Sequence, residues 1–65
     1  MPPVTIIIQK DNIEEKIEIT DRTLTVLFNA TDQAEVGTYG IDNRLTEDLG
    51  KIKAAILRVS KESET

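Results

Sequence analysis

The sequence predicts an α+β fold: a three- to four-stranded antiparallel β-meander with one C-terminal amphipathic helix packed on one face. Short segments in the first half alternate apolar and polar residues, and turn-forming residues separate these segments. Near the C-terminus, apolar residues instead recur at spacings of three and four. With 65 residues and neither a linker nor an internal repeat, the chain is expected to form one small domain over residues 1–65.

The first two strands are expected on either side of a tight turn. Residues 4–10 are rich in β-branched side chains, and the isoleucines of residues 13–21 share one parity while most charged residues take the other. Asp11 and Asn12 lie between these segments, and both residue types tolerate turn geometry. We therefore expect an antiparallel hairpin of these two strands.

A third strand is predicted over residues 23–30, where apolar and polar residues again alternate after a reversal at Asp21 and Arg22. A short fourth strand over residues 36–41 is weakened by its two glycines, which is why the predicted meander has three to four strands.

The C-terminal segment is predicted to be a helix over residues 46–61. Thr46 is the expected N-cap, and Glu47 precedes Lys51 in the favourable order for an ion pair one turn apart. The apolar stripe of this helix consists of Leu45, Leu49, Ile52, Ile56 and Val59. Such a stripe must be buried, and the apolar face of the meander is the candidate partner.

The composition removes most kinds of active site. The chain has no cysteine and no histidine, which excludes Ser–His and Cys–His catalysis and the common zinc sites. Twelve acids remain, but a sheet with one helix leaves little room for the walled pocket that paired carboxylates need. Asp11-Asn12 and Asp42-Asn43 are interpreted as turn and cap residues. We therefore predict no enzyme activity, no catalytic residue, no metal and no cofactor.

The charge is −4, with ten acids and three bases between Asp11 and Asp48, and four bases and no acid between Lys51 and Lys61. The expected sheet is acidic, whereas phosphate contacts need a basic surface. Tyr39 is the one aromatic residue outside the expected core, which leaves little for base stacking, so a nucleic-acid partner is not expected. No apolar run is long enough to span a membrane, and no signal-peptide pattern is present, so a cytoplasmic location is expected.

The predicted function is a non-enzymatic protein–protein interaction module: a homodimeric small adaptor, assembly factor or subunit of a larger complex. Eighteen Ile, Leu and Val residues make a small core, and strand edges and leftover aliphatic residues remain for a partner protein or a second copy. The candidate contact residues are Ile7, Leu27, Tyr39, Arg44, Lys51, Leu57 and Arg58.

The alternative is a small acidic regulator or inhibitor, either antitoxin-like or a virus-encoded blocker of a host protein. Its acidic surface would mimic a negatively charged ligand. Binding of that kind weakens steeply as salt rises, whereas apolar or strand-addition binding barely changes, so salt dependence separates the two hypotheses.

Overall fold

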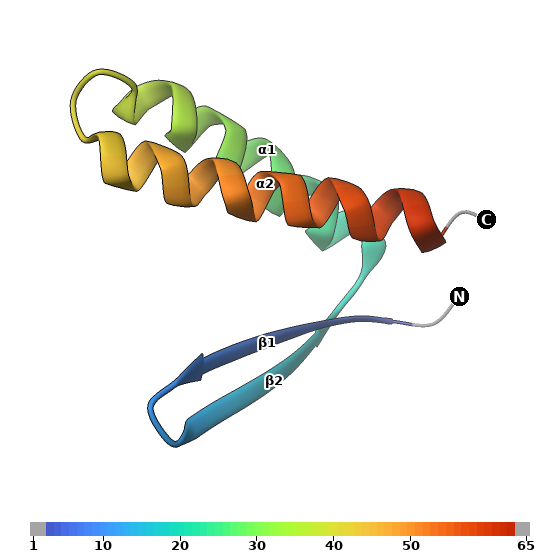
Figure 1. Ribbon diagram of the computed structural model, residues 1–65. Coiled ribbons are helices and arrows are strands. Elements are labelled where there is room, and N and C mark those ends of the chain that lie inside the picture. Colours follow the sequence, from blue (N-terminus) through green and yellow to red (C-terminus); the bar gives the residue numbers. More distant parts are fainter. Residues whose placement is uncertain (1–2, 64–65) are drawn as a thin grey trace.

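The computed structural model describes residues 3–63, and over this range the chain forms a β-hairpin followed by a helical hairpin (Figure 1). Strand β1 spans Val4–Lys10 and strand β2 spans Ile13–Ile19. Helix α1 spans Asp21–Thr38 and helix α2 spans Asn43–Ser63. The α+β class and the antiparallel pairing of the first strands are confirmed.

The β-hairpin has the predicted tight turn. Lys10 pairs with Ile13, and Asp11 adopts a positive φ of 56°, which aspartate tolerates better than most residues. Directly paired residues of antiparallel strands project to the same side, so the register defines one apolar face. This hairpin face carries Val4, Ile6, Ile8, Ile13, Ile17 and Ile19.

The predicted strands over 23–30 and 36–41 are wrong, because α1 occupies residues 21–38. Thr20 caps this helix, its Oγ1 accepting a hydrogen bond from the Thr23 amide at 3.2 Å, so the expected reversal after residue 20 is the first helical turn. Alternation over eight residues also fits a helix, since Leu24 and Phe28 are four apart and lie on the same helical face. Further along α1, Gln33, Ala34 and Glu35 are residue types that favour helix.

The connection between the helices is a type II turn over residues 38–41. Tyr39 has φ −60° and ψ 125°, Gly40 has φ 79°, and the Ile41 amide donates to the Thr38 carbonyl at 2.9 Å. The third position of such a turn requires a left-handed residue. Gly40 therefore ends α1 and reverses the chain, where the sequence predicted a weakened strand.

Helix α2 begins three residues earlier than predicted, because Asp42 caps it in place of Thr46. The Asp42 Oδ1 accepts a hydrogen bond from the Leu45 amide at 3.1 Å, which confirms the interpretation of Asp42 as a cap residue. The Thr46 hydroxyl instead lies 2.8 Å from the Thr38 hydroxyl and joins the ends of the helices. The helix runs to Ser63 rather than to residue 61.

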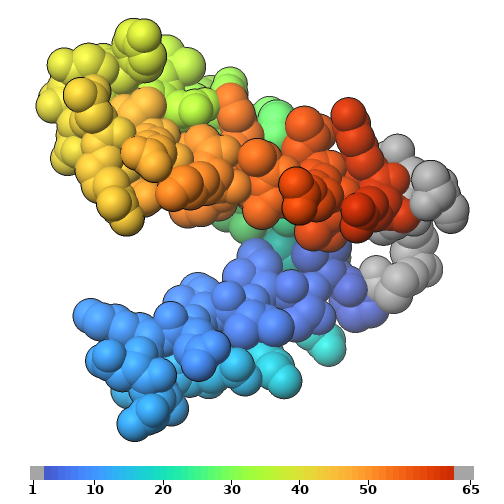
Figure 2. Space-filling model, viewed as in Figure 1, coloured from blue at the N-terminus to red at the C-terminus, as the bar shows by residue number. Residues whose placement is uncertain are grey.

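The predicted packing of the C-terminal helix on the sheet is also wrong: α2 packs along α1, and the tip of the hairpin stands away from both helices (Figure 2). Of the side chains that the structure describes, only Leu24 is buried, at 6% exposure. The chain exposes 5629 Å², whereas a compact monomer of this mass exposes about 4,200 Å². Its radius of gyration is 13.1 Å, against about 11 Å for a compact domain of this length.

Candidate protein interaction surfaces

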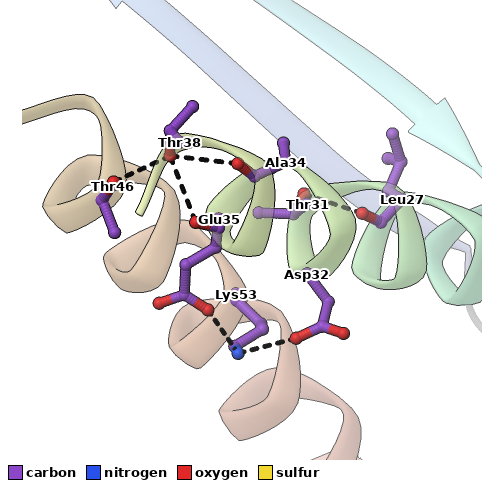
Figure 3. Close-up of polar contacts among 8 residues, drawn as sticks. All are labelled: Leu27, Thr31, Asp32, Ala34, Glu35, Thr38, Thr46 and Lys53. Atoms are coloured by element: carbon purple, nitrogen blue, oxygen red, sulfur yellow. Dashed lines mark hydrogen bonds and ion pairs between the residues drawn. The ribbon is translucent and has the colours of Figure 1, made fainter. Parts of the chain in front are cut away.

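A polar cluster joins the middle of α1 to the middle of α2 (Figure 3). The Lys53 Nζ donates to the Glu35 Oε1 at 2.5 Å and to the Asp32 Oδ1 at 2.9 Å. These hydrogen bonds, that to Glu35 first, favour the charged ammonium and hold the pKa of Lys53 above its ordinary value. The cluster therefore links α1 to α2 through two charged contacts.

Gly50 makes room for this cluster. A Cβ at residue 50 would lie 2.7 Å from the Glu35 Oε2, so a larger residue displaces the carboxylate that Lys53 binds. Glycine within a helix costs about 1 kcal/mol relative to alanine. A side chain at residue 50 would therefore move the end of Glu35 away from its hydrogen bond with Lys53.

The hairpin face is uncovered over most of its length. Near the helices, Val4, Ile6 and Ile19 are half-buried. Toward the turn, Ile8 is 59% exposed and Ile13 is 72% exposed. Six aliphatic residues on one face of a two-stranded hairpin need a cover, because an isolated hairpin is marginally stable in water.

The apolar stripe of α2 is wider than its contact with α1. Leu49 and Ile56 are half-buried against α1, whereas Ile52 and Val59 are 50% and 51% exposed. Leu45 shares their row, since residues seven apart on a helix are displaced by only about 20°. We call Leu45, Leu49, Ile52, Ile56 and Val59 the α2 stripe; in the part of the chain that the structure describes, its outer row stays about half exposed.

The turn between the helices adds a smaller apolar group at the opposite end of the helix pair from the chain termini (Figure 1). Val36, Tyr39 and Ile41 are all strongly exposed, with Tyr39 at 80%. Glycine at residue 40 keeps Tyr39 and Ile41 in a tight turn with their side chains in solvent.

The structure separates two of the contact residues that the sequence predicted. Ile7 is exposed on β1, on the face opposite the hairpin face, where Lys16 is its direct partner. Leu27 lies on α1 and not on the predicted third strand, so Ile7 and Leu27 do not share a sheet. The Leu27 side chain is 37% exposed.

The remaining predicted contact residues lie on α2 and in the turn before it, where Tyr39 is exposed. Arg44 pairs with Asp48 at 3.2 Å, and Lys51 pairs with Glu47 at 3.3 Å, which confirms the predicted spacing of the second pair. Leu57 and Arg58 line an open depression together with Ala54, Lys61 and Glu62.

Sequence reasoning assigned the outer row of the α2 stripe and Ile8 to the core and noted Ile13 only for its apolar parity, so it missed these residues as surface residues. One signal was available: with Leu57 beside the stripe, the apolar arc of the C-terminal helix is broader than a single facing element can cover.

Two open depressions lie among the described residues. The one lined by Leu24, Thr25, Phe28, Ile56, Leu57 and Ser60 has a volume of about 150 Å³, and the more open one that Leu57 and Arg58 line has a volume of about 350 Å³. Sites for small ligands are usually clefts of about 300–1,000 Å³ that bury most of the ligand. Among the described residues, no three carboxylate, histidine or cysteine side chains are placed to hold a metal ion. Within residues 3–63, neither helix has the length and apolar character to cross a membrane. Comparisons with protein-family models, with curated proteins and with solved structures found no match.

Proposed function

We propose that this chain is a non-enzymatic protein–protein interaction module that acts as a homodimer, as a small adaptor, an assembly factor or a subunit of a larger complex. The observation that carries the proposal is the uncovered apolar surface on both the hairpin and the helix pair. The protomer exposes about a third more surface than a compact monomer of its mass. Burial in a second copy is the simplest way to remove this surface from water.

The area is sufficient for a stable dimer. The surplus over a compact monomer is about 1,400 Å². A standard interface buries about 800 Å² on each partner, so dimerisation needs little more than half of the surplus. Both the hairpin face and the α2 stripe are rich in Ile, Leu and Val, as in obligate homodimer interfaces, which resemble a domain core cut in half.

The arrangement of the acids favours this proposal over an electrostatic blocker. In the described part of the chain, ion pairs engage at least these carboxylates: Glu14, Asp32, Glu35, Glu47 and Asp48. Carboxylates paired in this way contribute less to a field that would attract a basic host protein. In contrast, Ile8 and Ile13 of the hairpin face and the outer row of the α2 stripe stay about half or more exposed among the described residues.

Sedimentation equilibrium over a concentration series, at low and high salt, tests the proposal. We expect a dimer whose dissociation constant changes little with salt, because burial of apolar surface is not screened. A monomer at every concentration contradicts the proposal.

A matched pair of variants on α2 assigns the contact. Ile52→Glu introduces a charge into the exposed row of the α2 stripe and is expected to shift the protein to monomer. Ala54→Glu places the same charge on the opposite side of the same helix, because residues two apart do not share a face, and it is expected to leave the dimer intact. Equal dissociation of both variants would mean that added charge, and not the stripe, controls association.

A further inference from the structure

We propose that the dimer forms by reciprocal exchange: the hairpin face of each protomer packs on the α2 stripe of the other. This inference rests on the proposed function, because it specifies how a second copy would cover both apolar surfaces. It commits to one occupant for each surface, namely the other surface on a second copy of the same chain.

The first argument is the position of the hairpin. It extends away from the helices, so its tip side, with Ile8 and Ile13, and the outer row of the α2 stripe are both exposed in one protomer (Figures 1 and 2). Both surfaces are continuous. The strand register places the apolar residues of the hairpin on one face, and the seven-residue spacing aligns the outer row of the α2 stripe. A pair of such surfaces can cover each other only if a sheet face lies on a helix face.

The second argument is the link between the hairpin and the helices. Thr20 is the one residue between β2 and α1, and its extended φ and ψ of −84° and 164° set the direction in which the chain leaves the strand. Both of its oxygens are used: the carbonyl accepts from the Leu24 amide at 3.1 Å, and the hydroxyl accepts from the Thr23 amide at 3.2 Å.

This capped link opposes closure within one chain. Swinging the hairpin onto its own α2 requires new backbone angles at or next to the capped residue Thr20, whereas docking on a second copy keeps the observed angles. Short, constrained hinges favour exchange between copies for this reason.

The third argument is symmetry. If the hairpin of one copy covers α2 of the other, a two-fold axis places the second hairpin on the first α2, and the assembly closes as a dimer. Pairing like with like, hairpin to hairpin, leaves both α2 stripes exposed; pairing α2 to α2 leaves both hairpin faces exposed. Exchange is the arrangement that covers both surfaces in a closed dimer.

The absence of cysteine makes crosslinking a clean test. Glu15 is the cross-strand partner of Ile8, so Glu15→Cys places a thiol on the hairpin face. Ile52→Cys places a thiol on the α2 stripe. The two variant chains, one lengthened by a tag, are refolded together and treated with a short bismaleimide. Exchange predicts that the mixed product exceeds either self-linked product several-fold. Arg22→Cys, on the exposed first turn of α1, replaces Glu15→Cys in the control and is expected to give only background.

Every other outcome overturns the exchange. Glu15→Cys chains linked mainly to each other indicate paired hairpins, and Ile52→Cys chains linked mainly to each other indicate paired helices; both results leave the proposed homodimer standing. A chain that carries both substitutions and links within itself at high dilution indicates intramolecular closure. A monomer in sedimentation removes the proposed function and the exchange together.

Discussion

Ile7 and Ile8 form a matched pair for testing which face of the hairpin is buried on association. They are adjacent isoleucines on β1, 55% and 59% exposed, and they project to opposite faces. We expect Ile8→Lys to weaken the dimer strongly and Ile7→Lys to leave it nearly unchanged. Sequence reasoning singled out Ile7 as the contact residue, so the pair also tests that earlier expectation.

The magnitude follows from the exposure of Ile8. Full burial of an isoleucine stabilises by about 1.5–3 kcal/mol, and roughly three-fifths of this remains to be gained on association, or about 1–2 kcal/mol. A two-fold dimer contains the contact twice, so loss of Ile8 costs about 2–4 kcal/mol and weakens the dissociation constant about 30- to 800-fold. Burying a lysine in its place adds a desolvation cost, so these values are lower bounds.

Sedimentation equilibrium of both variants measures the dissociation constants, with circular dichroism as the check that each hairpin and helix pair still forms. A dimer of Ile8→Lys as tight as the unmodified protein would refute the assignment of the hairpin face. Dissociation of Ile7→Lys alone would place the contact on the opposite face, beside Lys16.

Three predictions concern the helix pair, all measured by thermal or urea unfolding at fixed protein concentration. Lys53→Met is expected to lower the melting temperature. Because the pKa of Lys53 is raised, its contribution is complete below the ordinary lysine pKa of about 10.4 and is lost as the pH rises through the raised value; a difference already lost at neutral pH contradicts this. Gly50→Ala is expected to raise the free energy of unfolding by close to the full helix-propensity difference of about 1 kcal/mol only when Glu35→Ala is also present. Equal gains in the presence and absence of the Glu35 side chain would show that its close approach to residue 50 does not matter. Gly40→Ala is expected to destabilise by about 1–2 kcal/mol, since its φ is 79°. Gly37→Ala, where an added Cβ meets nothing within 4 Å, should stabilise; destabilisation by both would show a general intolerance of side chains near the turn.

The local features of the hairpin were predictable from sequence because they depend on neighbouring residues. Period-two alternation places Ile17 and Ile19 on one face, and Asp11 and Asn12 suit a tight turn, without reference to the rest of the chain. The ion pair of Glu47 and Lys51 is equally local, because residues four apart on a helix are neighbours.

The segment from residue 23 to residue 41 was predicted wrongly because its first part fits two periods. Leu24 and Phe28 belong both to a strand alternation and to a helical row. The decision depends on burial against α2, where Leu24 packs deepest, and on the cap at Thr20. The polar cluster was also missed, because residues 32 and 53 approach each other only after α1 and α2 pack.

The sequence by itself determined the α+β class, the hairpin with its apolar face, and an amphipathic C-terminal helix, since each follows from short-range periodicity and turn chemistry. Only the tertiary structure decided which element packs on which apolar face. Helix α2 packs on α1 and not on the sheet, because a second helix takes the place of the predicted third strand. Because α2 packs on α1, much of the hairpin face and the outer row of the α2 stripe are exposed to solvent. The proposals for this protein rest on these two surfaces.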